Sequence, residues 1–181
     1  MRTFVAVEVN SKEALQSMLD FQKALLQTGV RARPVEANRL HFTIMFLGEI
    51  NTVMLESIKS KLSDIKFEPI QVTYTGVGVF PKPDFVRVIW VGVDNDSGSK
   101  LINLAKEVES RLNMLGFKSD KPFKPHITLF RVRDKMRNLD AILNFKDKNF
   151  GTDTLSTVKV KKSDLTPSGP IYSDLFSVGS K

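Results

Sequence analysis

The first half of the chain alternates strand-like and helix-like patterns of hydrophobic residues. Alternation with a period of two predicts strands, and apolar residues three or four positions apart predict amphipathic helices. These patterns predict a strand at Thr3–Val9, a helix at Ala14–Leu25, a strand at Leu40–Leu47 and a helix at Thr52–Leu62. Ser11 and Asn51 are typical N-caps for the two helices, and Gly29 is a typical stop signal after the first.

The second half of the chain repeats this order of elements. The patterns predict a strand at Val86–Val93, a helix that is capped by Asp96 or Ser97 and continues to Leu112, a strand at His126–Phe130 and a helix near Lys135–Leu143. Corresponding strands, glycine stops and histidines lie about 84, 87 and 85 residues apart. A recurring order of elements at nearly constant spacing predicts two similar lobes.

Three further β-rich segments are expected to complete two sheets. They are Ile70–Gly76, Leu155–Lys161 and Ile171–Val178. Proline-containing turns are predicted at 81–83 and 167–170. We therefore expect a single two-lobed domain over residues 1–181. Its lobes would be built mainly from about 1–80 and about 84–165, with the strand at 171–178 completing a sheet.

Composition excludes several classes of protein. Of the 181 residues, 41% are hydrophobic and 26% charged, which is typical of a globular protein and argues against disorder. Cysteine is absent, which excludes disulfides, thiolate metal sites and a cysteine nucleophile. The formal charge of +7 mildly favours a polyanionic partner. The strongly apolar run Phe42–Leu47 is too short to span a membrane, and Glu8 interrupts any signal-peptide core, so we expect a soluble cytoplasmic protein.

The chain contains two histidines, and each begins a predicted strand with the same local motif. The motifs are HFTI at 41–44 and HITL at 126–129. Side chains alternate between the two faces of a strand, so His41 shares a face with Thr43, and His126 shares a face with Thr128. The same alternation directs Phe42, Ile44 and Phe46, and likewise Ile127 and Leu129, to the opposite face.

If a pseudo-two-fold axis relates the lobes, the two motifs face one cleft. Two imidazoles then form an acid–base pair near neutral pH, and the two threonine hydroxyls hold phosphate oxygens. Arg39 and Lys124 precede the histidines by two positions and fall on the same side of each strand. Such a group of residues suits in-line displacement at a phosphodiester, with cations stabilising the charge that develops on phosphorus.

Other interpretations of the histidines have less support. A single histidine on a strand is usually structural, but two at matched positions favour a shared role. No Asp or Glu lies within four residues of either histidine, which argues against a zinc site. No serine elbow, Walker or dinucleotide motif occurs, and Gly76–Gly78 is more typical of a turn or bulge.

These motifs resemble those of the 2H phosphoesterase superfamily, and within it the RNA 2′,3′-cyclic phosphodiesterase (2′-5′ RNA ligase) group. The similar segments are RTFVAVEV at 2–9, RLHFTIMFLGEI at 39–50, VRVIWVGV at 86–93, KPFKPHITLFRV at 121–132 and SDLTPSGPIYSDL at 163–175. The resemblance implies an α+β fold with an internal pseudo-two-fold. Two similar lobes would carry antiparallel β-sheets that face a central cleft, with the helices on the outside.

The resemblance also implies a reaction and roles for the residues. A terminal 2′,3′-cyclic phosphate of RNA would be hydrolysed to a 2′-phosphomonoester without a metal or cofactor. His41 would be the proton donor and His126 the proton acceptor. Thr43 and Thr128 would hold phosphate oxygens, and Arg131 would be a further phosphate contact. The reverse reaction implies weak 2′-5′ ligation.

The remaining candidates concern substrate binding. Arg39 and Lys124 are expected to bind phosphate, and Phe123 is the preferred candidate for base stacking, ahead of four other phenylalanines: Phe42, Phe46, Phe80 and Phe130. Phe130 stands where relatives usually have a small residue, which predicts a narrower cleft. Further cations flank the motifs, namely Arg31, Arg33, Lys118 and Lys121. The run Lys159, Lys161 and Lys162 is expected to be a solvated strand face.

The expected partner is RNA with 2′,3′-cyclic phosphate ends, with tRNA fragments among the candidates, and with no membrane and no obligate protein partner. A monomer is the default expectation. Two alternatives stay open on the sequence. One is a binding module that holds RNA ends without turnover. The other is a phosphodiesterase with the same chemistry that acts on a small cyclic nucleotide or a 2′-5′ oligoadenylate.

Overall fold

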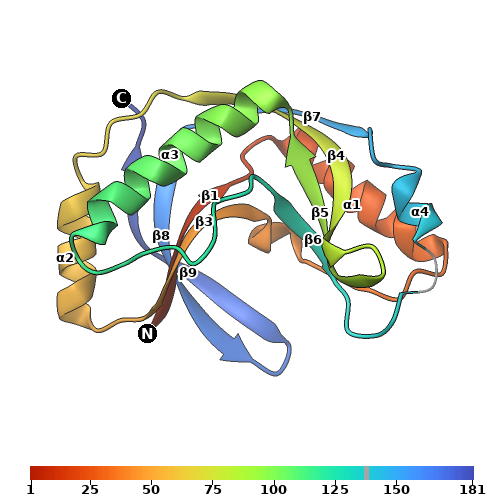
Figure 1. Cartoon of the computed structure of the whole chain (residues 1–181), viewed down its shortest axis with the longest axis horizontal. Coiled ribbons are helices and arrows are strands. Elements are labelled where there is room, and N and C mark those ends of the chain that lie inside the picture. Colours follow the sequence, from red (N-terminus) through yellow and green to blue (C-terminus); the bar gives the residue numbers. More distant parts are fainter. Residues whose placement is uncertain (137–138) are drawn as a thin grey trace.

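The described chain forms one antiparallel β-sheet covered by helices (Figure 1). The computed structural model describes residues 1–136 and 139–181. The described elements are β1 (Arg2–Glu8), α1 (Lys12–Gln27), β2 (Arg33–Pro34), a 3₁₀ turn (Ala37–Arg39), β3 (His41–Glu49), α2 (Thr52–Leu62), β4 (Ile70–Lys82), β5 (Phe85–Val93), α3 (Asn95–Asn113), β6 (Ile127–Arg131), α4 (Asp140–Leu143), β7 (Asn149–Leu155), β8 (Thr157–Thr166) and β9 (Gly169–Gly179).

The sheet consists of two halves that meet at one point. The strand order is β7-β4-β5-β6-β3-β1-β8-β9, and β2 adds to the free side of β6. Strands β3 and β6 pair only through Phe42 and Ile127, and both of these side chains are fully buried. The strands diverge beyond this pair. The result is the expected α+β architecture of two antiparallel lobes with a cleft between them.

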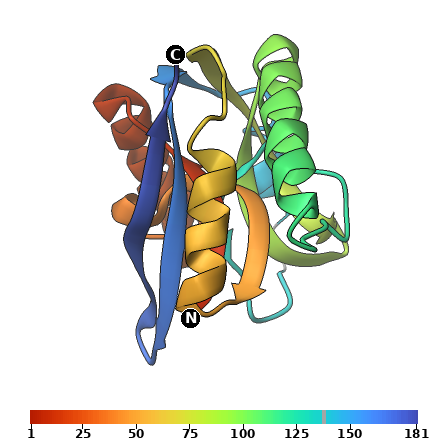
Figure 2. The same cartoon turned by 90° about the vertical axis from the view of Figure 1, so that its left-hand side faces the viewer.

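The helices lie on the outer faces of the two halves. In Figure 1, α1 and α4 lie on the β4–β7 side and α2 lies on the other side, while α3 runs from α2 toward β4 and packs against both β3 and β4. The long β8–β9 hairpin projects beyond the rest of the molecule at the bottom of Figures 1 and 2. The motif strands β3 and β6 therefore lie at the centre of the molecule, with the hairpin beside them.

The two sheet halves do not correspond to the two halves of the sequence. Strand β4 pairs with β5 and β7, while β8 pairs with β1, and β9 pairs with β8 at the edge of the sheet. The lobe boundaries predicted at 1–80 and 84–165 therefore do not separate the halves of the sheet. The short connection after Lys82 explains part of this exchange, because strands joined by a tight turn usually pair with each other.

Most predicted elements are present, with small shifts at their ends. The helix Thr52–Leu62 has the predicted bounds, and Asn51 accepts a hydrogen bond from the Met54 amide as its cap. Ser11 likewise caps α1, and Gly29 follows that helix with a φ of 86°. A left-handed φ of this kind is easily adopted by glycine, which confirms the predicted stop.

Two local predictions differ from the structure, and one strand was missed. The cap of α3 is Asp94, whose carboxylate accepts from the Ser97 amide, so the prediction of Asp96 or Ser97 was wrong. Strand β7 was not predicted. Of the helix expected near Lys135–Leu143, the structure shows Asp140–Leu143 as helical, and residues 137–138 lie outside the described part of the chain.

One hydrophobic core extends through both halves of the sheet and includes the inner faces of α1, α2 and α3. Within residues 1–136 and 139–181, no helix combines the length and the apolar character that crossing a membrane requires.

Candidate functional site: a cationic cavity with two histidines

Both histidine motifs line one cavity between the two halves of the sheet. Its volume is about 470 Å³. His41 and Thr43 contribute from β3, and His126 and Thr128 contribute from the start of β6. Other lining residues come from the ends of β1, β2, β8 and β9. Residues 85 positions apart in the sequence therefore meet in one space that is open to a ligand.

The two imidazoles are held in similar ways. Nδ1 of His126 lies 2.6 Å from the Lys124 carbonyl oxygen, and the ring of His41 hydrogen-bonds to the backbone of Arg39. A carbonyl only accepts hydrogen bonds, so Nδ1 of a neutral His126 carries the proton and Nε2 is left as the basic atom. Nε2 of His41 lies 3.1 Å from the hydroxyl oxygen of Thr43. This arrangement suits proton transfer at each Nε2.

A β-bulge in each motif strand changes which residues face the cavity. Opposite β1, the register skips Ile44, because Ala6 pairs with Thr43 and Val5 pairs with Met45. Opposite β5, it skips Leu129 in the same way, since Trp90 pairs with Thr128 and Ile89 pairs with Phe130. An extra residue reverses the alternation beyond it. The two bulges occupy equivalent positions, 85 residues apart.

The bulges correct two predictions about side-chain direction. Phe46, assigned by strict alternation to the face opposite His41, lines the cavity and is 73% exposed. Phe130 is fully buried instead of narrowing the cleft, and the next residue, Arg131, lines the cavity. Phe46 and Arg131 therefore occupy matching positions in the two motifs, one aromatic and one cationic.

The environments of the two histidines differ. The ring of His41 stacks on Phe4 with 5.1 Å between centroids and meets Tyr172 edge-on at 5.5 Å. Burial lowers the pKa of His41 to about 4, against the opposing effect of its hydrogen bond to the Arg39 backbone. Burial also lowers the pKa of His126, which meets the ring of Phe80 edge-on at 4.9 Å. Both rings are therefore neutral at pH 7 when no anion is bound.

The cavity is strongly cationic. Five arginines line it, namely Arg2, Arg33, Arg39, Arg131 and Arg133, and no described lining residue is an aspartate or glutamate. Of the predicted substrate contacts, Arg39 and Arg131 line the cavity, but Phe123 and Lys124 do not. Phe123 packs against the core, and the Lys124 ammonium lies over the Phe80 ring, 5.9 Å from its centroid.

The lysine run on β8 was wrongly predicted to be a solvated face. Lys161 is only 5% exposed and forms ion pairs with Glu8 and Asp174. Lys159 pairs with the same two carboxylates at 2.7 Å. Burial acts against ionisation of Glu8, yet hydrogen bonds from both lysines hold the pKa of Glu8 below its usual range. Because Glu8 lies opposite His41 in the β1–β3 register, this charge cluster supports the strand that carries His41.

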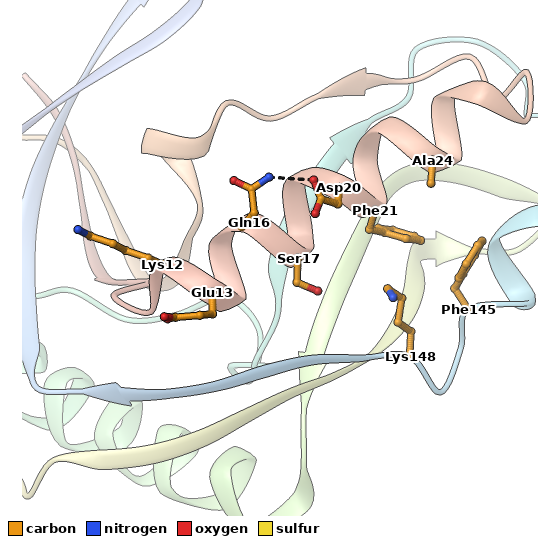
Figure 3. A pocket seen from close by; sticks show the side chains of 9 residues that line it. All are labelled: Lys12, Glu13, Gln16, Ser17, Asp20, Phe21, Ala24, Phe145 and Lys148. Carbon is orange, nitrogen blue, oxygen red and sulfur yellow. Dashed lines mark hydrogen bonds between the residues drawn. The ribbon is translucent and has the colours of Figure 1, made fainter.

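A larger hollow of about 640 Å³ lies elsewhere, between α1 and residues 145–148 (Figure 3). Its polar groups include Lys12, Glu13 and Lys148, and Gln16 donates a hydrogen bond of 2.8 Å to Asp20. Neither histidine lines this hollow, so its size does not make it the better candidate. Over the described residues, no group of three or more histidine or carboxylate side chains is placed to hold a metal ion.

Comparisons with known proteins agree with this fold. A family described as the AKAP7 2′5′ RNA ligase-like domain matches residues 2–173. The chain is 39% identical over 178 residues to an RNA 2′,3′-cyclic phosphodiesterase of Archaeoglobus fulgidus, covering 97% of this chain and 98% of that protein. It is 36% identical over 177 residues to a protein of the same name from Methanocaldococcus jannaschii, covering 95% and 96%.

Solved structures show the same architecture. The protein TT0787 of Thermus thermophilus superimposes with a TM-score of 0.79 at 25% identity, covering 99% of this chain and 97% of that one. E. coli LigT complexed with 3′-AMP also reaches a TM-score of 0.79, at 23% identity and with the same coverage, which supports the fold alone. The family match and the two sequence relatives show that the chain belongs to the 2′-5′ RNA ligase-like family of 2H phosphoesterases.

Proposed function

We propose that this protein hydrolyses the 2′,3′-cyclic phosphate at the end of an RNA to a 2′-phosphomonoester. The observation that carries the proposal is the pair of similarly held histidines in one cationic cavity. Membership of a family with curated RNA 2′,3′-cyclic phosphodiesterases supports the choice of substrate.

In the proposed mechanism, His126 is the base and His41 is the acid. Nε2 of His126 takes a proton from water as the water oxygen attacks phosphorus. The bond from phosphorus to the 3′ oxygen breaks, and His41 gives its proton to that oxygen. A 2′-phosphomonoester and a 3′ hydroxyl result, and a proton has moved in effect from one histidine to the other. No metal ion takes part in this proposal.

The low pKa of His41 is compatible with its role as the acid. A phosphodiester carries a negative charge, and an anion close to an imidazole favours the protonated ring. Substrate binding therefore raises the pKa of His41 from about 4 and favours protonation of the ring in the substrate complex, where it acts as the acid. Thr43, Thr128 and Arg131 would contact the phosphate oxygens and stabilise the charge that develops on them.

We assign base stacking to Phe46 in place of Phe123. Phe46 is exposed and lines the cavity, whereas Phe123 packs against the core outside it. Because Phe46 and Arg131 occupy matching positions, the nucleobase would stack on Phe46 of the first motif strand and the phosphate would contact Arg131 of the second. This asymmetry would orient the substrate relative to two similar histidines.

With a 5′ hydroxyl in place of water as the nucleophile and the 3′ oxygen again as the leaving group, the same site would join a cyclic phosphate to a second RNA, so weak 2′-5′ ligation belongs to the proposal. The proposed substrates are RNA ends in the cytoplasm, tRNA fragments among them, and the proposed working form is a monomer. Product analysis separates this function from two alternatives. One is a non-catalytic module that binds RNA ends, and the other is an enzyme for small cyclic nucleotides or 2′-5′ oligoadenylates.

The decisive experiment is incubation of an oligoribonucleotide ending in a 2′,3′-cyclic phosphate, followed by separation of the products. We expect a 2′-phosphate end, and a rate roughly 10²–10⁴-fold lower in His41→Ala and in His126→Ala. Ser17→Ala, in the larger hollow beside α1, is the matched control and should keep the full rate. An unchanged substrate would favour the binding module, and cleavage restricted to mononucleotides would favour the small-molecule enzyme.

A further inference from the structure

Two arginines that the proposed chemistry does not fully use face each other beside the reaction centre. Arg33 of β2 lies directly opposite Arg131 of β6 in the register of the two strands. Side chains at such positions have Cβ atoms about 4.5–5.5 Å apart, and like charges there are destabilising. Neither arginine takes part in an ion pair with any residue that the structure describes.

Arg39 is a third arginine in this region, and it meets Arg33 at the tip of the β8–β9 hairpin. The guanidinium of Arg33 donates a hydrogen bond to the Ser168 carbonyl. A Cβ added to Gly169 would lie 2.8 Å from Nη1 of Arg39 and 3.6 Å from Nη2 of Arg33. The two guanidinium groups therefore converge on one glycine. Glu36 pairs with Arg39 at 3.3 Å but is itself 60% exposed and does not line the cavity.

The scissile phosphate does not account for this concentration of charge. That phosphate would lie between the two histidines and the two threonines, near the point where β3 meets β6. Allowing for the bulge at Leu129, Arg131 follows Thr128 by two strand positions, roughly 7 Å along the strand. Arg33 lies across from Arg131 in the strand register, and the guanidinium groups of Arg33 and Arg39 lie against the hairpin at Gly169. A single phosphodiester carries one negative charge, so the cavity has cationic donors for a second one.

We propose that Arg33 and Arg39, beside Arg131, bind the phosphodiester that joins the terminal nucleotide to its 5′ neighbour. This inference rests on the proposed function, since the cyclic phosphate occupies the 3′ end of the RNA and any further phosphate lies on its 5′ side. Guanidinium groups bind phosphate with two parallel hydrogen bonds, and Ser168 fixes the orientation of one of them. The substrate class is therefore an oligoribonucleotide of at least two nucleotides, in preference to a nucleoside cyclic phosphate.

The test compares two substrates that differ by this one phosphodiester. Adenosine 2′,3′-cyclic phosphate lacks it, and the dinucleotide ApA ending in a 2′,3′-cyclic phosphate contains it. We expect kcat/KM of the native protein to be about tenfold or more higher for the dinucleotide, since hydrogen bonds to charged groups contribute at this scale. Arg33→Gln should lose most of this preference, because kcat/KM falls much more for the dinucleotide than for the mononucleotide.

A matched control separates local contact from general electrostatics. Arg31 lies in the same loop, is exposed and does not line the cavity. Arg31→Gln removes the same charge and should preserve the dinucleotide preference. With longer RNA, Arg33→Gln should also reduce the slope of log affinity against log salt by about 0.7, the value for one lost phosphate contact on a single strand.

Binding of products tests the subsite without turnover. The dinucleotide ending in a 2′-phosphate should bind the native protein more tightly than adenosine 2′-phosphate does, and Arg33→Gln should abolish the difference. The inference would be overturned if the native protein had the same kcat/KM and the same affinity for the mononucleotide and the dinucleotide. It would also be overturned if Arg31→Gln and Arg33→Gln reduced the dinucleotide preference equally. Length-dependent binding that needs Arg33, without hydrolysis of either substrate, would keep the subsite and reject the proposed function.

Discussion

The protonation of His41 gives a prediction that can be followed on a single residue. The ring lies against Phe4 and Tyr172, and burial lowers its pKa from 6.5 to about 4. One pKa unit corresponds to about 1.4 kcal/mol, so the folded protein disfavours the imidazolium of His41 by about 3 kcal/mol. We expect this cost to appear in the stability of the protein as the pH falls.

The direction of the effect follows from proton binding in the two states. Below about pH 6.5 the unfolded chain takes up a proton on His41, whereas the folded protein does so only near pH 4. Stabilisation from the neutral ring is therefore complete above pH 6.5 and is lost as the pH falls toward 4. Between pH 7 and pH 4 the free energy of unfolding should fall by about 3 kcal/mol more in the native protein than in His41→Gln.

Two measurements check this expectation. Urea unfolding at several values between pH 7 and pH 4 compares the native protein with His41→Gln. Proton NMR follows the imidazoles directly, because the chain contains two histidines and the variant identifies which resonance is His41. Adding a nucleoside 2′-phosphate should raise the pKa of His41, since the anion favours the protonated ring. Titration of the His41 resonance near 6.5, with parallel unfolding curves for both proteins, would refute the reasoning.

Three further predictions concern the rest of the site. Phe46→Ala should raise KM for RNA by roughly tenfold, because base stacking contributes about 1–3 kcal/mol, and Phe123→Ala should leave KM unchanged in the same assay. Lys161→Met should lower the free energy of unfolding at pH 7 by about 1–3 kcal/mol. This loss is smaller than for a fully buried ion pair, because Glu8 and Asp174 are partly exposed. Urea unfolding should show that the difference from the native protein shrinks in acid, because both carboxylates become protonated. Chelator should leave the hydrolysis rate intact, and a strict requirement for added metal would contradict the metal-independent mechanism.

The local structure could be predicted because neighbouring residues largely determine it. Ser11 and Asn51 cap the predicted helices, since a side-chain oxygen close to free amides needs no distant partner. The motif strands were also predicted, and alternation correctly placed His41 with Thr43 and His126 with Thr128. The matched positions of the two motifs, 85 residues apart, by themselves indicate that the motifs form a pair.

Beyond Thr43 and Thr128, the same reasoning failed. Alternation assumes an unbroken ladder, and the extra residues Ile44 and Leu129 break it. A bulge depends on how the neighbouring strand pairs, and that strand is distant in sequence. The direction of the next cavity-facing side chain was therefore not accessible from the motifs alone. Buried Lys161 is a similar case, because its carboxylate partners come from β1 and β9.

The sequence by itself determined the helices, the strand motifs and the residue types available for acid–base chemistry at a phosphate. The tertiary structure decided which strands adjoin, which residues turn toward the cavity and how the two histidines differ. Burial and charge are properties of what packs around a residue. Phe4 and Tyr172 against His41, or Arg33 opposite Arg131, come together only when distant segments fold onto each other.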